Sequence, residues 1–305
     1  MNASVIEKPS HAEESVTPES VAPDTVSPGA LVPYWSASRL KMLLQCPRQF
    51  RYRYLDAIPA LATAPIVFGK TLHEVLRVAG ERHMASGELP VVAEMLLHLA
   101  RAWNAALEEH QPLFGTGHPS GPSHHSHDDY LLLGGAMLER FYERFAHQPP
   151  PLAVELAFEI PWGESSLLGF IDRVDEVGTD EAPNGLVVVD YKSGARKPSP
   201  RQASEDLQLT VYALAARQVL GQSVSRVEFH CLRDGTSVGS TRDEATVQAQ
   251  MHQVWNSVQQ CTQRGEFPPC PGYYCRFCDY RELCQAEGFV ADGRRPRGEC
   301  DGPCR

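Results

Sequence analysis

The segment Leu186-Val187-Val188-Val189-Asp190-Tyr191-Lys192-Ser193-Gly194 decides the fold of this chain. Its solidly apolar start predicts a strand over 186–192. Side chains two apart on a strand point to the same side, so Asp190 and Lys192 are expected to project together. The sequence therefore predicts a strand that carries an acid and a base side by side at its end.

Apolar periodicity on both sides of this strand defines the rest of the fold. Helical patterns occur over 36–46, about 68–82, 91–110 and 130–147, and the period changes to alternation from Ala153. Strands are predicted over 154–160, 167–177 and 226–232, and helices over about 204–220 and 242–264. This order predicts an α/β core with a mixed sheet flanked by helices, and a helical insertion at about 85–150.

The two ends of the chain differ from this core in composition. Residues 1–33 are rich in Pro, Ser and Glu and hold five acids and one lysine, which predicts a disordered tail. Residues 291–305 read as a flexible polar tail in which Cys300 and Cys304 are free thiols. One domain is therefore expected over 34–290. The histidine-rich loop 118–129 is read as solvated, although its histidines and acids offer metal ligands.

Charge and hydropathy limit the possible partners. Without the first 33 residues the chain holds 33 acids and 27 bases, a net charge of −6. This balance argues against a large nonspecific DNA-coating surface, but it leaves room for an enzyme with a basic groove. We see no run of eighteen apolar residues and no secretory signal, so we expect a cytoplasmic protein without a membrane partner.

A second acid precedes the deciding segment. The strand before it contains Gly169-Phe170-Ile171-Asp172, which can place Asp172 beside Asp190. Two converging carboxylates oppose each other's ionisation unless a cation lies between them, and Mg²⁺ or Mn²⁺ suits such an oxygen-lined site. Lys192 would then orient an attacking water or offset charge on a phosphate. The alternative interpretation is a simple surface ion pair between Lys192 and one of these acids.

Two polar residues on the following helix extend the pattern. Gln208 and Tyr212 are four residues apart, so they are neighbours on one helix face beside an apolar stripe. A boundary between core and solvent produces the same pattern.

Together these motifs resemble the RecB-like PD-(D/E)XK nucleases, including the AddB and CRISPR-associated RecB-like branches. The matching motifs are Phe68-Gly69 with His73, G-F-I-D-R-V-D at 169–175, V-V-D-Y-K-S-G at 188–194 and Q-L-T-V-Y at 208–212. The resemblance implies that Asp172, Asp190 and His73 are metal ligands and that Lys192 is the catalytic lysine. It also implies that Gln208 and Tyr212 form a Q-x-x-x-Y motif near the site.

The cysteines suggest a second cofactor. Cys275, Cys278 and Cys284 have the spacing C-x2-C-x5-C, which serves zinc or an iron–sulfur cluster. Both need four ligands, so a fourth cysteine must come from elsewhere, and Cys46 and Cys270 compete for this place. The resemblance implies Cys46 and a [4Fe–4S] cluster that joins the N-terminal segment to residues 267–287. A local set with Cys270 would instead bind Zn²⁺.

The segment after Cys46 contains Arg48, Arg51, Tyr52 and Arg53. Bases interleaved with aromatics suit contacts to a DNA backbone and stacking on bases. In the alternative interpretation, the tyrosines pack against the cysteine site.

The combined expectation is a metal-dependent DNA nuclease that prefers single-stranded DNA or free ends, with a helicase or CRISPR-adaptation partner. Its setting would be repair, recombination or defence. The alternatives are a nonhydrolytic module that binds DNA ends or a helicase partner, and a zinc-knuckle interaction protein. Chelator-sensitive cleavage of labelled DNA separates the enzyme from both.

Overall fold

The computed structural model describes residues 32, 34–60, 62–110, 126–177 and 185–289. The predicted C-terminal tail, the loop before Ser126 and all of the N-terminal tail except Val32 lie outside these residues. Within the described part of the chain, no helix has the length and apolar character needed to cross a bilayer.

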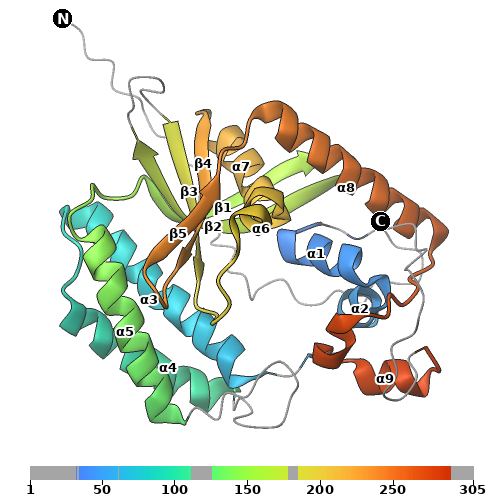
Figure 1. The fold of residues 1–305 in the computed structure, drawn as a ribbon, viewed down its shortest axis with the longest axis horizontal. Coiled ribbons are helices and arrows are strands. Elements are labelled where there is room, and N and C mark those ends of the chain that lie inside the picture. Colours follow the sequence, from blue (N-terminus) through green and yellow to red (C-terminus); the bar gives the residue numbers. More distant parts are fainter. Residues whose placement is uncertain (1–31, 33, 61, 111–125, 178–184, 290–305) are drawn as a thin grey trace, which may run out of the picture.

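A five-stranded mixed sheet forms the centre of the molecule (Figure 1). The strands lie in the order of the chain: β1 (Ala153–Trp162), β2 (Ser165–Val177), β3 (Gly185–Lys192), β4 (Val224–Cys231) and β5 (Thr236–Ser240). Only the β3–β4 pair is parallel, and its crossover contains helices α6 and α7. The predicted α/β class with a mixed sheet flanked by helices is confirmed.

Helices cover both faces of this sheet (Figure 1). One core joins the sheet to α1 (Ala37–Gln45), α7 (Leu207–Leu220) and α8 (Glu244–Arg264). A second core joins it to α3 (Ala64–Ser86), α4 (Val92–His110) and α5 (His127–Phe145). Val188 lies in the first core and Val189 in the second, as the alternation of a buried strand requires. The shorter helices are α2 (Pro47–Phe50), η1 (Arg51–Leu55), α6 (Pro200–Glu205), η2 (Tyr273–Phe277) and α9 (Arg281–Ala286).

Two elements differ from the prediction. The helix expected over 204–220 is broken at Asp206, whose backbone is extended and whose carboxylate caps α7 by accepting from the N–H groups of Gln208 and Leu209. Strand β5 was not predicted, because its sequence Thr-Ser-Val-Gly-Ser lacks apolar alternation. It pairs with β4 on one side and forms an edge of the sheet.

Candidate active site and cysteine cavity

Asp190 and Lys192 lie at the end of β3, on the side of the sheet that α7 covers. Asp190 is 1% exposed, and Lys192 Nζ lies 2.6 Å from its Oδ2. This contact is an ion pair, but Oδ2 has no hydrogen bond of acceptable geometry. A buried carboxylate whose Oδ2 contacts a single ammonium group keeps the capacity to bind a further donor or cation.

Asp172 on β2 is held beside Asp190 by a hydrogen bond from the backbone of β3. The described pairing of β2 with β3 ends at Arg173 and Val189. Two residues beyond Val189, the Tyr191 N–H donates to Asp172 Oδ2 at 2.7 Å, so this side chain replaces a partner on the neighbouring strand. The two acids therefore come from adjacent strands, as the sequence predicted, and both are buried.

Glu155 on β1 is a third acid at this site, and the sequence analysis did not find it. The register of β1 and β2 is unbroken around it, with Val154 opposite Arg173 and Leu156 opposite Ile171, so Glu155 lies opposite Asp172. Its φ of 43° is unusual for a residue other than glycine, and such strain gathers at functional sites. The sequence did contain a clue to the position of Glu155. Gly163-Glu164 forms a two-residue turn between β1 and β2, and such a turn fixes which residues of the two strands lie opposite each other.

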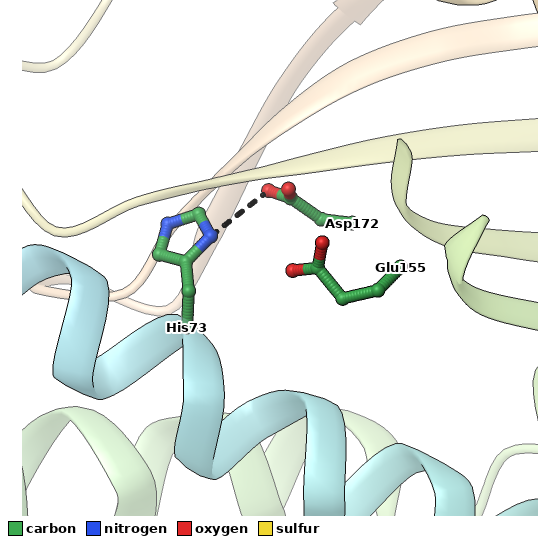
Figure 2. Close-up of side chains that lie close together, drawn as sticks. All are labelled: His73, Glu155 and Asp172. Carbon is green, nitrogen blue, oxygen red and sulfur yellow. Dashed lines mark ion pairs between the residues drawn. The ribbon is translucent and has the colours of Figure 1, made fainter. Parts of the chain in front are cut away.

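His73 on α3 completes the group (Figure 2). Its Nδ1 lies 3.4 Å from Asp172 Oδ2. Burial favours the neutral imidazole, but the hydrogen bond and charge of Asp172 outweigh it and, with Asp190 and Glu155, raise the pKa of His73 to about 9. Within the described residues, His73, Glu155 and Asp172 form the one group of three or more possible ligands whose atoms lie within 4.8 Å of one another.

The electrostatics of these acids fit a divalent cation. Burial, followed by the charge of Asp172, raises the pKa of Glu155 to about 7. Burial also raises the pKa of Asp190 to about 6, although Lys192 opposes the shift. Crowded, buried carboxylates hold their negative charge poorly without a counter-charge, and oxygen donors with one imidazole are ligands for Mg²⁺ or Mn²⁺. The donor set therefore suits a metal.

Gln208 and Tyr212 border this site from α7. Gln208 Oε1 accepts hydrogen bonds from Lys192 Nζ and from Lys41 Nζ, each at 3.3 Å. Gln208 Nε2 donates to the Tyr212 hydroxyl at 2.9 Å. Burial, with the charges of Asp190 and Asp172, raises the pKa of Tyr212 well above its usual value, so the phenol stays neutral. The predicted pair thus lies next to the lysine rather than within the group of acids.

Four free cysteines line a hollow between the two ends of the domain: Cys46, Cys275, Cys278 and Cys284. Cys46 lies between α1 and α2, and its Sγ accepts from the Cys270 N–H at 3.4 Å. The Gly272 N–H donates to Cys275 Sγ at 3.2 Å. Burial, with the other thiols adding to it, raises the pKa of both Cys278 and Cys284 to about 11. Four thiols around one hollow fit a thiolate-bound metal group.

The remaining described cysteines lie outside this set. Cys270, the rival fourth ligand, is disulfide-bonded, and so is Cys261. Cys231 is buried and free. Cys300 and Cys304 fall outside the described residues.

The basic and aromatic segment after Cys46 is engaged within the protein. Tyr52 is 2% exposed, packs on Tyr280 and donates to Glu287 Oε2 at 2.6 Å. The guanidinium of Arg48 lies over the Tyr52 ring, and Arg51 pairs with Asp56. Tyr52 therefore packs beside the cysteine hollow, as the alternative interpretation expected. DNA contact by Arg48, Arg51 and Arg53 stays a prediction.

Taken together, the mixed sheet with acids, a histidine and a lysine at the ends of its strands is the site of a metal-dependent phosphodiester hydrolase. A family profile described as the PD-(D/E)XK nuclease superfamily matches residues 34–285, and the chain belongs to this superfamily. Its nucleases use divalent metals and act on nucleic acid.

Other comparisons add little. No curated protein matches the chain. A solved structure titled "Crystal structure of SSO0001" is 13% identical over 86% of this chain and 89% of that chain, with a TM-score of 0.35. At that score the likeness supports no argument about function.

Proposed function

We propose that this protein is a divalent-metal-dependent deoxyribonuclease, an exonuclease that acts on single-stranded DNA or on DNA with free ends. The observation that carries this proposal is the convergence of Asp172 and Asp190 from adjacent strands with Lys192 2.6 Å from Asp190. The setting of repair, recombination or defence, with a helicase or CRISPR-adaptation partner, rests on the resemblance to RecB-like nucleases.

Each side chain of the site has a role in this proposal. Asp172 and Asp190 hold the metal, with His73 and Glu155 completing its shell. A bound Mg²⁺ or Mn²⁺ supplies Lewis acidity at the scissile phosphate and lowers the pKa of a bound water. Lys192 offsets the charge that develops on the phosphate, because its ammonium lies beside Asp190 at the end of the same strand. Gln208 keeps that ammonium in place through its Oε1, and Tyr212 holds the amide from the other side.

The cysteine hollow is proposed to hold a [4Fe–4S] cluster on Cys46, Cys275, Cys278 and Cys284. A single zinc ion binds thiolates at about 2.3 Å, which requires sulfurs within about 4.6 Å of one another. No three of the described cysteines meet a 4.8 Å limit. Thiols spaced more widely around a hollow favour a larger group over one zinc ion. The N–H donors to Cys46 and Cys275 are also typical of iron–sulfur sites.

A single-stranded substrate is favoured by an aromatic surface next to the hollow. Tyr273 and Tyr274 are 58% and 60% exposed, and the guanidinium of Arg276 lies 3.5 Å from the Tyr273 ring centroid. Exposed aromatic rings with an adjacent arginine suit unpaired bases and the backbone that joins them. We therefore assign the stacking on DNA bases to Tyr273 and Tyr274 and not to the buried Tyr52.

The test is cleavage of end-labelled single-stranded, double-stranded and circular DNA with Mg²⁺, Mn²⁺ or chelator. We expect cleavage that needs the metal, favours single strands and spares circles. Asp190→Ala should be inactive, whereas Arg201→Ala, which removes a surface ion pair with Glu205, should act like the wild type. Metal-independent cleavage, or equal cleavage by Asp190→Ala, would overturn the proposal.

A further inference from the structure

Lys41 on α1 belongs to none of the sequence motifs described above, yet its side chain contacts Gln208 at the candidate active site. Its Nζ lies 2.9 Å and 3.1 Å from the two carboxylate oxygens of Asp206 and 3.3 Å from Gln208 Oε1. Gln208 Oε1 is the same atom that accepts from Lys192. Two lysines, far apart in the sequence, therefore share one amide oxygen.

From this geometry we infer that Lys41 is a positioning residue for Lys192 and acts through Gln208. The inference rests on the proposed function, since it concerns the lysine of that site. An ammonium group only donates, so both lysines require the oxygen of the amide to face them. The amide nitrogen then faces the Tyr212 hydroxyl, to which it donates. Lys41 thereby fixes which end of the Gln208 amide meets Lys192.

Lys41 also fixes the position of the helix that carries Gln208. Asp206 caps α7, with its Oδ1 accepting from the N–H groups of Gln208 and Leu209. Because Lys41 binds Asp206 as well as Gln208, it holds the first turn of α7 at two points. Its helix packs in the same core as α7, so the connection is anchored at both ends.

The contacts of Lys41 indicate that it positions Lys192 and does not bind DNA directly. An ammonium group has three donors, and three acceptor atoms already take them: both oxygens of Asp206 and Gln208 Oε1. The side chain of Lys41 is 38% exposed, yet no donor is left for a phosphate unless one of these bonds breaks. The orientation of Lys192 is therefore the property that depends on Lys41.

The test is the kinetics of Lys41→Met, a change that keeps the length of the side chain and removes its charge. With saturating Mg²⁺ we expect kcat to fall about tenfold, while KM and the Kd for DNA in Ca²⁺ stay within about twofold. The double variant with Gln208→Ala should be no slower than Gln208→Ala alone within about twofold, because both changes remove one connection. Arg201→Ala serves as the control for loss of a surface ion pair.

Other outcomes overturn the inference. Unchanged kcat, or losses that multiply in the double variant, would show that Lys41 does not act through Gln208. A weaker Kd with a salt slope reduced by about one would show that Lys41 binds a phosphate instead. A crystal structure of Lys41→Met with Lys192 Nζ still on Gln208 Oε1 would also contradict it. Failure of the wild type to cleave DNA is a different result, which removes the proposed function itself.

Discussion

The acidic site and the cysteine hollow are built in different ways. Asp172 and Asp190 stand on strands in the middle of a five-stranded sheet, with an extensive apolar core on each face. The hollow joins two short chain segments. Phe50 and Phe267 anchor these segments in the first core, but the hollow itself lies beside the small cluster of Tyr52, Tyr280 and Cys284 with a few partly buried neighbours. The first site is therefore shaped by the fold, whereas we expect the second to depend on the group that we propose binds there.

Removal of Cys46 should give the largest change in stability. Cys46 and Cys275 are 229 residues apart, so a group bound by both closes a very long loop. By analogy with disulfides, such a link is worth about 4–5 kcal/mol. We expect Cys46→Ala to lose iron and sulfide and to expose both the N-terminal segment and residues 267–287 to protease. Iron content, thermal unfolding and limited proteolysis measure this.

The matched control is Cys231→Ala, because Cys231 is also a free cysteine but is buried and lies outside the hollow. It should keep its iron. If Cys46→Ala retained its iron and only the N-terminal region became cleavable, Cys46 would not be a ligand. A colourless protein with one zinc per chain would show that the cysteines bind zinc and not the proposed cluster.

Changes at the acidic site should affect chemistry without loosening the fold. Asp172→Ala, Asp190→Ala or Lys192→Ala should each lower the rate of DNA cleavage about a thousandfold or more, about 4 kcal/mol of transition-state stabilisation. Thermal unfolding should stay cooperative, because both apolar cores remain intact and the backbone loses one side-chain partner at most, that of the Tyr191 N–H in Asp172→Ala. Near-normal Mg²⁺-dependent cleavage by any of the three would remove that residue from the site.

The sheet should also respond to acid through a buried histidine. Burial lowers the pKa of His230 to about 4, although Glu228 opposes the shift, whereas an unfolded histidine titrates near 6.5. The unfolded state therefore binds the extra proton between these values, and stability falls as the pH falls below 6.5. At pH 5 this one residue should cost about 2 kcal/mol relative to pH 7.5.

The measurement is denaturant unfolding of the wild type and His230→Phe from pH 7.5 to 5. The variant keeps a ring against Phe145, which contacts His230 edge to face. It should lose less stability over this range than the wild type. Parallel curves for the two proteins would show that His230 does not contribute to the acid response.

The smallest effects are expected from His73 and Gln208. His73 completes a shell that the carboxylates define, and Gln208 acts through Lys192. Alanine at either position should slow cleavage about tenfold, about 1.4 kcal/mol. If Gln208→Ala were silent on several DNA substrates, that face of α7 would be structural only.

Sequence periodicity predicted the parts of the molecule that follow one simple rule. Alternation located β1, an apolar run located β3, and the period of two placed Asp190 and Lys192 together, where the structure has an ion pair. Of the three residues that form the metal group, Asp172 and His73 were expected from the family resemblance, but Glu155 was not predicted. Glu155 is brought to Asp172 by the register of a hairpin, and its strained φ leaves no trace in composition.

Long-range contacts could not be predicted from the sequence for a similar reason. Lys41 lies on an ordinary amphipathic helix, and only the packing of α1 beside α7 brings it to Gln208. The break at Asp206 depends on a side-chain cap that a continuous helical pattern hides. The disulfide bonding of Cys261 and Cys270 likewise follows from geometry rather than from spacing.

The most direct test of the central claim is the position of Mn²⁺, found by anomalous scattering from soaked crystals of the protein. The account predicts a peak at the acidic site, within about 2.0–2.3 Å of a carboxylate oxygen of Asp172 and adjacent to Glu155, His73 and Asp190. Crystals of Asp172→Asn should lose the peak or show it much weakened. A wild-type crystal with Mn²⁺ bound elsewhere and no peak among these side chains would contradict the account.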